Sequence, residues 1–349
     1  MTDHHRLKVA FSSYDPSCLV HGGFQIQIRE TMSALRALGG DICHLEWWNP
    51  DQRPDIIHVF GRPHGALAGY AHRKGVKVVF SDLLTEQGSR SGAKLLCQQW
   101  AGRIARRILP EAVSRLAGWT AYREADAVIA LTRWEKSLMC RLYGADPGKI
   151  HVIPNGVDDA FLTGDGGSAA GVTGSEASLL CVATITPRKR VLEVAQAAAE
   201  AGVPIQFAGA PYSETDPYYL EFLDEVEKSG GTLRYLGSIT DRARLASAYR
   251  SSRGFVLAST MESQSLAALE AASCGLPLLL SDLPWAREVF GNSAAYIPAS
   301  CRRSVLGNRL KAFYEDAAAG RRISITPVSW KCVGNELLDL YQRIVRESE

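Results

Sequence analysis

The stretch Ser259 to Ser281, STMESQSLAALEAASCGLPLLLS, decides how this chain folds. It follows an apolar run, Gly254 to Ala258, that reads as a buried strand, and it leads into a second such run, Pro277 to Leu280. The residues between the runs are mostly good helix formers, and Gly275 marks the end of the helix. The stretch therefore predicts a strand, loop, helix and strand, as in a parallel α/β sheet.

The start of this helix is a predicted anion site. Ser263 or Ser265 is the expected N-cap, and two carboxylates lie nearby, Glu262 in the loop and Glu270 one to two turns into the helix. A helix that begins where a buried strand ends presents unpaired N–H groups and the positive end of its dipole, which favours phosphate. The carboxylates would accept hydrogen bonds from ribose and sugar hydroxyls. A surface helix with two solvated glutamates is the alternative.

This segment resembles the E-x7-E region of retaining family 4 glycosyltransferases, which reads S-x-x-E-G-F-G-L-x-x-x-E-A-x-A-C-G-x-P. The matching positions are Ser259, Glu262, Leu266, Glu270, Ala271, Cys274, Gly275 and Pro277. The difference lies in the phosphate loop, where Ser263, Gln264 and Ser265 stand in place of G-F-G. Serine narrows such a loop but leaves its N–H groups available, so we interpret the change as a variant of the same site.

Composition sets limits on the class of protein. The chain has 349 residues, of which 46% are hydrophobic and 22% charged, so it is long enough for two globular domains. A net charge of +2 gives no case for a nucleic-acid partner, and eight scattered cysteines without a C-x-x-C pair indicate neither a zinc site nor a disulfide framework. Without a leader or an apolar run of about 18 residues, we expect a cytoplasmic protein whose membrane contact is at most peripheral.

Strands and helices alternate through the first half. The expected strands are Leu7 to Ser12, Ile42 to Leu45, Ile56 to Phe60, Val76 to Ser81 and Ala127 to Ala130. The expected helices are Phe24 to Leu38, Ala93 to Tyr122 with a break at Pro110, and Arg133 to Tyr143. This alternation predicts a parallel sheet covered on both faces.

A loop with His21, Gly22 and Gly23 joins the first strand to its helix, where open α/β sheets bind ligands. It lacks G-x-G-x-x-G, so a dinucleotide site is not indicated. The loop is similar to the G-G-x7-L loop of the same glycosyltransferases, which implies that Gly22 and Gly23 approach the donor phosphates and acceptor. A tight turn that needs glycine is the alternative.

Histidine chemistry could only belong to the first half, because every histidine lies at or before His151. His58 on a strand reads either as a packed residue or as a catalytic one. Many members of the resembled family carry a site histidine in a V-x-x-H-D context, but the corresponding Val78 to Leu84, VVFSDLL, has none. Asp82 or Glu86 then takes part of that polar role, or the site differs.

Residues 90–123 form a basic amphipathic segment. Its cations are Arg90, Lys94, Arg103, Arg106, Arg107, Arg115 and Arg123, against the single acid Glu111. Trp100, Ile104, Ile108 and Leu109 are interleaved with them. Such a helix can lie on an anionic membrane surface, and a solvated helix face is the alternative.

The second half repeats the alternation after a linker. Residues 149–158, KIHVIPNGVD, resemble the end of the first domain in the same family, and residues 164–178 are rich in glycine, serine and alanine. Further on, Thr184 to Arg190, TITPRKR, ends a strand in three cations that could neutralise a diphosphate or could form a basic surface turn. The family pattern G-R-x-x-P-R-K-G has Thr184 in place of its first arginine, whereas Arg188 and Lys189 match.

The resemblance at four separated segments implies a GT-B architecture, with two Rossmann-like doubly wound domains that face a cleft. We expect an acceptor domain at 1–165, a nucleotide-sugar domain at 166–327, and at 328–349 a helix that crosses back to the first domain. The implied function is metal-independent, retaining transfer of a sugar from a nucleotide diphosphate sugar to a hydroxyl acceptor, without a cofactor. The expected acceptor is a saccharide or a lipid-linked compound, as in polysaccharide or glycolipid synthesis.

The resemblance also implies roles for the site residues. Lys189, Arg188 and the N–H groups of Gln264, Ser265 and Leu266 would stabilise the leaving diphosphate next to Ser263. Glu262 would hold the donor sugar and Glu270 the ribose. Two alternatives stay open, namely a binding or scaffold protein that has lost the chemistry, and a sugar-nucleotide 2-epimerase.

Overall fold

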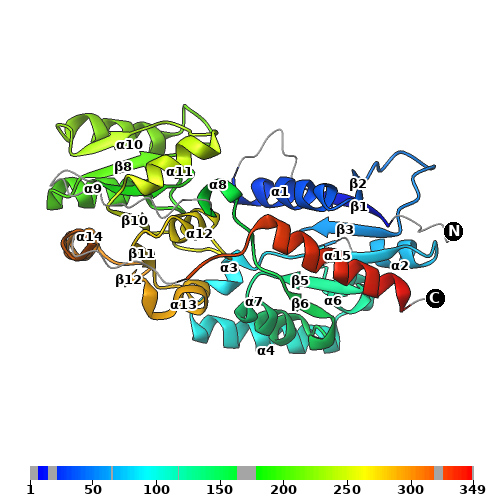
Figure 1. The fold of residues 1–349 in the computed structure, drawn as a ribbon. Helices are drawn as coiled ribbons and strands as arrows, with labels where there is room; N and C mark the ends of the chain where they lie inside the picture. The colour runs from blue at the N-terminus through cyan, green and yellow to red at the C-terminus, as the bar shows by residue number, and fades with distance from the viewer. Residues whose placement is uncertain are drawn as a thin grey trace. The chain divides into compact units, whose positions relative to one another are not determined.

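The structure is a computed structural model that describes residues 7–14, 22–63, 66–116, 118–162, 178–317 and 325–347 (Figure 1). The chain divides into two compact units. Unit 1 combines Met1–Asn155 with Trp330–Glu349, and unit 2 is Gly156–Ser329. The predicted linker at 164–178 and the predicted boundary at 165 fall almost entirely within 163–177, which lies outside the described residues.

Unit 1 contains a six-stranded parallel sheet with the order β2-β1-β3-β4-β5-β6. Its strands are β1 (Lys8–Ser13), β2 (Asp41–His44), β3 (Ile56–Phe60), β4 (Lys77–Ser81), β5 (Ala127–Ala130) and β6 (Ile150–Val152). In the register of the central strands, Phe11 of β1 lies opposite His58 of β3, which in turn lies opposite Val79 of β4. The central strands β3, β4 and β5 are almost wholly buried, as near-continuous apolar runs in a doubly covered sheet must be.

Helices cover both faces of this sheet (Figure 1). They are α1 (Gly23–Ala37), α2 (Leu67–His72), α3 (Thr85–Gly88), α4 (Gly92–Ile108), α5 (Glu111–Leu116), α6 (Ala121–Glu124), α7 (Arg133–Leu138) and α15 (Trp330–Arg346). One face packs with α2, α4, α6 and α7 in a single apolar cluster. On the other face α1 and α15 pack against each other, so the C-terminal helix belongs to unit 1.

Unit 2 contains a second six-stranded parallel sheet with the order β12-β11-β10-β7-β8-β9. Its strands are β7 (Leu179–Val182), β8 (Ile205–Ala208), β9 (Leu233–Tyr235), β10 (Gly254–Leu257), β11 (Leu278–Ser281) and β12 (Ala295–Ile297). Its helices are α8 (Asp159–Leu162), α9 (Val191–Ala201), α10 (Pro217–Lys228), α11 (Arg242–Arg250), α12 (Leu266–Ser273), α13 (Pro284–Phe290) and α14 (Arg303–Ala317).

The side chains of β7, β10, β11 and β12 alternate between two apolar clusters, whereas β8 and β9 contribute to one of them. Cys181 and Phe207 point to the face with α9, α10 and α14, whereas Leu180 and Phe255 point to the face with α8, α11, α12 and α13. A parallel bridge between Val157 and Ser329 brings together the two ends of the unit. The predicted doubly wound α/β fold in both halves is confirmed.

One helical prediction needed correction. The helices expected over roughly 93–122 are α4, α5 and α6, and the first break falls at Pro110 as expected. The helix expected over 133–143 ends as an α-helix at Leu138 and continues as a π-helical turn, Met139–Tyr143, which Gly144 closes in the left-handed conformation.

Candidate active site

The strand order of unit 2 reverses between β7 and β10. From β7 the chain winds outward to β8 and β9, then returns to β10 and winds the other way. The helix after β7, α9, covers one face, and the helix after β10, α12, covers the other. The loops that leave these two strands therefore separate at the carboxyl edge of the sheet, which is where doubly wound sheets bind ligands. Both predicted motifs of unit 2 lie on these loops.

The two loops are joined by charged side chains. The Lys189 ammonium donates a hydrogen bond to Oε1 of Glu262, and Nη1 of Arg188 lies 3.7 Å from Oε2 of the same carboxylate. The backbone N–H of Thr260 also donates to the carbonyl of Arg188, at 2.9 Å. Glu262 is buried, although Arg188 is partly exposed, so the carboxylate relies on these cations. The structure thus brings together the three predicted catalytic residues.

The predicted phosphate loop leads into α12. Ser265 is the N-cap of the helix, and its Oγ accepts a hydrogen bond from the backbone N–H of Ala268 at 3.4 Å, which confirms one of the two expected caps. Ser263 and Gln264 are buried beside it, and Leu266 is the first residue of the helix. The positive end of the α12 dipole thus lies in the same loop as Glu262.

Two buried hydroxyls lie at this edge, and neither was given a role from the sequence. Oγ1 of Thr186, in the loop after β7, and Oγ of Ser259, in the loop after β10, have no hydrogen-bond partner among the described residues. A buried hydroxyl without a partner costs free energy, so a bound ligand oxygen or water at each is expected. The sequence offers only a weak indication that these hydroxyls could contact a ligand, because isolated serine and threonine residues are common in loops.

Glu270 is held from the neighbouring helix α11. The hydroxyl of Tyr249 donates to Oε2 of Glu270 at 3.0 Å, and Nη1 of Arg242 donates to Oε1 at 3.3 Å. Burial, reinforced by the Glu270 carboxylate, raises the pKa of Tyr249 well above its ordinary value, so the phenol stays protonated and donates. Sequence analysis missed both partners, which lie 21 and 28 residues before Glu270.

The third cation of the TITPRKR motif has a different place. Arg190 is buried, and its guanidinium donates to the carbonyls of Ala299 and Cys301, both at 3.0 Å. Its backbone has φ of 55°, a left-handed conformation that glycine adopts more readily, at the start of α9. Arg190 therefore anchors the loop that carries Lys189 rather than standing beside it as a third ligand for phosphate.

In unit 1, Gly22 precedes α1 and Gly23 is its first residue. The carbonyl of Gly22 accepts a hydrogen bond from the N–H of Ile26 at 3.2 Å, which begins the helix. The α1 N-terminus therefore lies at the carboxyl end of β1, beside the point where the strand order of unit 1 reverses. His21, the other residue of this predicted loop, lies outside the described residues.

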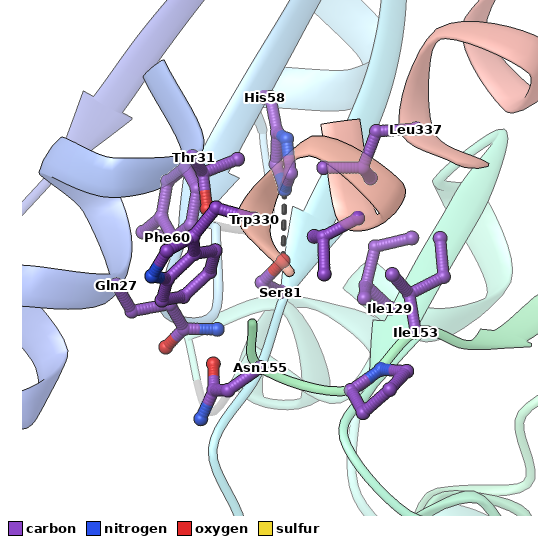
Figure 2. Close-up of a pocket in the computed structure, with 12 residues that line it drawn as sticks. Gln27, Thr31, His58, Phe60, Ser81, Ile129, Ile153, Asn155, Trp330 and Leu337 are labelled. Atoms are coloured by element: carbon purple, nitrogen blue, oxygen red, sulfur yellow. Dashed lines mark hydrogen bonds between the residues drawn. The ribbon is translucent and has the colours of Figure 1, made fainter. Parts of the chain in front are cut away.

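His58 lies in the interior of unit 1. Its Nδ1 is 2.5 Å from the Tyr341 hydroxyl of α15, and its Nε2 is 2.8 Å from Oγ of Ser81, as the dashed line in Figure 2 shows for the second contact. Burial lowers the pKa of His58 to about 3, so the ring is neutral at physiological pH. With both ring nitrogens bonded inside the protein, His58 has the geometry of a packed residue.

A small cavity adjoins His58 between α1, α15 and the sheet (Figure 2). Its volume is about 10 Å³, which is close to the space that one water molecule needs. Gln27 and Thr31 line it from α1, Trp330 from α15, and Asn155 from the segment after β6. The cavity is too small for a substrate.

The polar residues that follow β4 are also bonded within unit 1. Asp82 is buried and accepts from Nη2 of Arg62 at 2.9 Å and from the hydroxyl of Tyr122. The Arg62 guanidinium lies 4.3 Å from the ring centre of Tyr143. Glu86, the other expected substitute for the family histidine, is more exposed and pairs with Arg90.

Among the described residues, the structure holds no group of three or more His, Cys, Asp and Glu side chains that could bind a metal ion. Within the same ranges, no helix is both long enough and apolar enough to cross a membrane.

Two family models match successive parts of the chain, namely Glycosyltransferase Family 4 over residues 21–161 and Glycosyl transferases group 1 over residues 170–324. A D-inositol 3-phosphate glycosyltransferase 2 of Catenulispora acidiphila is 29% identical over 265 residues, which are 68% of this chain and 61% of the relative. The match thus spans about three fifths of that protein.

The fold is similar to that of solved structures across nearly the whole chain. Sucrose-phosphate synthase from Thermosynechococcus elongatus superposes with a TM-score of 0.66 at 16% identity, and covers 98% of this chain and 100% of its own. Anabaena HepE in complex with UDP superposes with a TM-score of 0.61 at 14% identity, and covers 97% and 100%. With two doubly wound units and both family models in order, this chain belongs to the family 4 glycosyltransferases and has the GT-B fold.

Proposed function

We propose that this protein transfers a sugar from a nucleotide diphosphate sugar to a hydroxyl acceptor, with retention of the anomeric configuration. The observation that carries the proposal is the meeting of Lys189, Arg188 and Glu262 between the loops that leave β7 and β10, beside the α12 N-terminus. Two cations and a helix dipole at one point favour a diphosphate, and a carboxylate in the same place can accept hydrogen bonds from a sugar.

The chemistry follows from where charge develops. As the bond from the sugar to the diphosphate breaks, negative charge grows on the phosphate oxygens. Lys189, Arg188 and the N–H groups of Gln264, Ser265 and Leu266 stabilise that charge. No divalent metal ion is then required.

In the structure Lys189 donates to Glu262, so a bound diphosphate competes for this ammonium. As Lys189 turns to the phosphate, the Glu262 oxygens accept hydrogen bonds from hydroxyls of the donor sugar. Glu270 accepts from the ribose hydroxyls, and the departing phosphate takes the proton of the acceptor on the same face of the sugar. Thr186 and Ser259 supply hydroxyls that a phosphate oxygen or a water can satisfy.

The nucleotide and acceptor are proposed by class. UDP is the first nucleoside diphosphate to test, because Anabaena HepE was solved with UDP. The acceptor is a hydroxyl compound that lies near Gly22 and Gly23 at the start of α1. A D-inositol 3-phosphate is one acceptor to test, since the relative from Catenulispora acidiphila carries that name.

The decisive experiment is a thermal-shift screen of UDP, GDP, ADP, CMP and dTDP with magnesium or with EDTA, followed by donor turnover. A ligand that binds only the folded state raises its apparent stability. We expect one diphosphate to raise the melting temperature regardless of metal, and Glu270→Ala to abolish the shift. Glu227→Gln, an exposed carboxylate on α10, is the matched control.

No shift with any nucleotide would contradict the proposal and favour a scaffold protein. Conversion of the sugar while it stays on its nucleotide, without an acceptor, would indicate an epimerase instead. Metal-dependent transfer would contradict the proposed role of the cations.

We also propose that the enzyme works in the cytoplasm at an anionic membrane surface, which α4 contacts. Exposed apolar side chains recur along this helix at four-residue spacing, namely Leu96, Trp100, Ile104 and Ile108. Arg103 and Arg107 are exposed on the same helix. An interfacial helix presents to anionic lipids an apolar stripe with arginines beside it. A helix face that only contacts water would not be expected to carry such a stripe.

Vesicle co-sedimentation tests this contact. We expect binding to phosphatidylglycerol vesicles but not to phosphatidylcholine vesicles. The binding should be lost when Trp100 and Ile104 are both changed to Gln, or when Arg103 and Arg107 are both changed to Glu. Leu220→Gln, at an exposed leucine on α10, is the control. Equal binding by all variants would overturn the role of α4.

A further inference from the structure

A second exposed apolar surface lies in unit 1, just beyond the carboxyl ends of β1 and β2. Tyr14 follows β1, and Trp47 and Trp48 follow β2. All three side chains are exposed, and that of Trp48 is 95% exposed. The rings of Tyr14 and Trp47 have centroids 6.4 Å apart and planes 35° apart, so the two loops form one surface. We call these three residues the aromatic cluster.

Hydrogen bonds hold the loop that carries the tryptophans. The side-chain amide of Gln52 donates to the carbonyl of His44 at 2.9 Å, and its Oε1 accepts from the N–H of Glu46 at 2.9 Å. The N–H of Asn49 donates to the carbonyl of Glu46 at 3.0 Å, and its side-chain amide donates to the Glu46 carboxylate at 2.6 Å. These hydrogen bonds order the turn that carries the two exposed tryptophans. Large aromatic side chains that are exposed to solvent on an ordered turn usually mark a binding surface.

The position of the aromatic cluster points to a substrate. In unit 1 the sheet order reverses at β1, which has β2 on one side and β3 on the other. Doubly wound sheets bind ligands at the carboxyl edge beside such a reversal. Tyr14 lies one residue beyond the end of β1, and its contact with Trp47 extends the surface toward β2.

The chemistry of the surroundings selects a saccharide over a lipid surface. Between residues 46 and 53 the charged side chains are Glu46, Asp51 and Arg53, so carboxylates outnumber cations, in contrast to α4. The face of an aromatic ring is electron-rich, and the C–H groups on one face of a pyranose ring pack against it. Carboxylate and amide groups such as those of Glu46 and Asn49 can accept and donate hydrogen bonds at the rim, where a sugar carries its hydroxyls.

We propose that Tyr14, Trp47 and Trp48 form an acceptor subsite that stacks on a saccharide with two or more sugar rings. The proposal rests on the proposed function, because it names the class of the hydroxyl acceptor. A monocyclic polyol cannot cover three aromatic side chains on two loops, whereas successive rings of an oligosaccharide can.

The test uses the whole protein and a set of defined mono-, di-, tri- and tetrasaccharides as probes. Binding is first screened on an array, and the best ligand is then titrated and used as an acceptor. We expect the wild-type protein to bind an oligosaccharide more tightly than its monosaccharides. Trp47→Ala and Trp48→Ala should each raise the KM for that acceptor about tenfold, with kcat changed little.

Three controls make the result specific. Trp47→Tyr, which keeps an aromatic face, should restore most of the affinity, and Tyr70→Ala, at an exposed tyrosine on α2, should have no effect on the KM. The melting temperature should stay the same in Trp48→Ala, since this side chain is almost wholly exposed in the folded protein.

The outcomes separate the two proposals. If UDP binds and the donor is hydrolysed, but no saccharide binds or the tryptophan variants keep the wild-type KM, the saccharide subsite is refuted and the proposed function stands. If no nucleotide binds, the proposed function itself has failed. A change of oligomeric state in Trp48→Ala, measured by sedimentation, would assign the aromatic cluster to a contact between copies and overturn the subsite.

Discussion

Removal of one hydroxyl, in Tyr249→Phe, tests whether α11 positions the Glu270 carboxylate, which we propose binds the ribose. The Tyr249 hydroxyl donates to Glu270 at 3.0 Å, and the side chain is fully buried. A hydrogen bond to a charged group contributes about 1.5–3 kcal/mol, and phenylalanine keeps the ring contacts with Phe161 and Phe255. We therefore expect the free energy of unfolding of unit 2 to fall by about 1.5–3 kcal/mol, which lowers its melting temperature by roughly 3–10 °C.

The same change should weaken nucleotide binding. Without the Tyr249 donor, Glu270 keeps the 3.3 Å contact from Arg242 but loses a hydrogen bond that orients its carboxylate, so more of its motion must be lost when the proposed ribose binds. We expect the Kd for UDP, measured by calorimetry, to rise about fivefold to tenfold, while kcat at saturating donor changes little.

Tyr296→Phe is the matched control. Its hydroxyl donates to the carbonyls of Ala286 and Gly291, also in unit 2, at 3.1 and 2.8 Å. That variant should lose stability without losing UDP affinity. If Tyr249→Phe binds UDP as tightly as wild type, or if both variants lose affinity in proportion to their stability, the positioning role is refuted.

Three further variants test other parts of the structure. Lys189→Ala should lower kcat about 100-fold with a soluble acceptor, because it removes charge stabilisation from the leaving group; an unchanged rate would move that role to another residue. Arg190→Ala should lower the melting temperature, because it leaves the carbonyls of Ala299 and Cys301 without the hydrogen bonds that Arg190 donates. Amide hydrogen exchange should become faster in unit 2 alone. His58→Gln should make the free energy of unfolding depend less on pH between pH 3 and pH 6.5. The folded pKa of His58 is about 3 and its ordinary value is 6.5, so the unfolded state binds the proton more readily between these values. The contribution of neutral His58 to the free energy of unfolding is therefore fully present above pH 6.5. It falls by about 1.4 kcal/mol per pH unit as the pH drops toward 3. Denaturant titrations from pH 7 to 4 that show parallel curves for both proteins would contradict this.

The alternation of strands and helices was readable from sequence because buried parallel strands are short apolar runs between turn residues. Residues 56–60 and 127–130 were predicted with the boundaries that the structure has. The residues of the candidate active site were readable for a different reason, since Lys189, Glu262 and Glu270 lie in motifs with fixed spacing.

The partners that hold these residues could not be predicted. Tyr249 and Arg242 reach Glu270 only because α11 packs beside α12, a contact that no local pattern encodes. Arg190 looked like one more cation beside Lys189, because its direction depends on a left-handed backbone and on carbonyls more than 100 residues away. Spacing tells which residues share a loop, whereas packing decides where each side chain points.

The place of α15 has a consequence for synthesis on the ribosome. The face of the first sheet that α15 covers stays open until Trp330–Arg346 emerges, after the whole of unit 2 has been made. At 5–20 residues per second that delay is roughly 10–40 s. During this time His58 lacks its Tyr341 partner, 283 residues away, and the face of the sheet that α15 covers is exposed to chaperones or to aggregation.

A fragment that ends near Asn155 should therefore leave that face of the sheet uncovered permanently. An excision that joins Asn155 directly to Trp330 through a short linker should give a folded unit 1, since the bridge between Val157 and Ser329 shows that the chain leaves and re-enters at neighbouring points. Unit 2 can complete its fold first, although it comes second in the sequence.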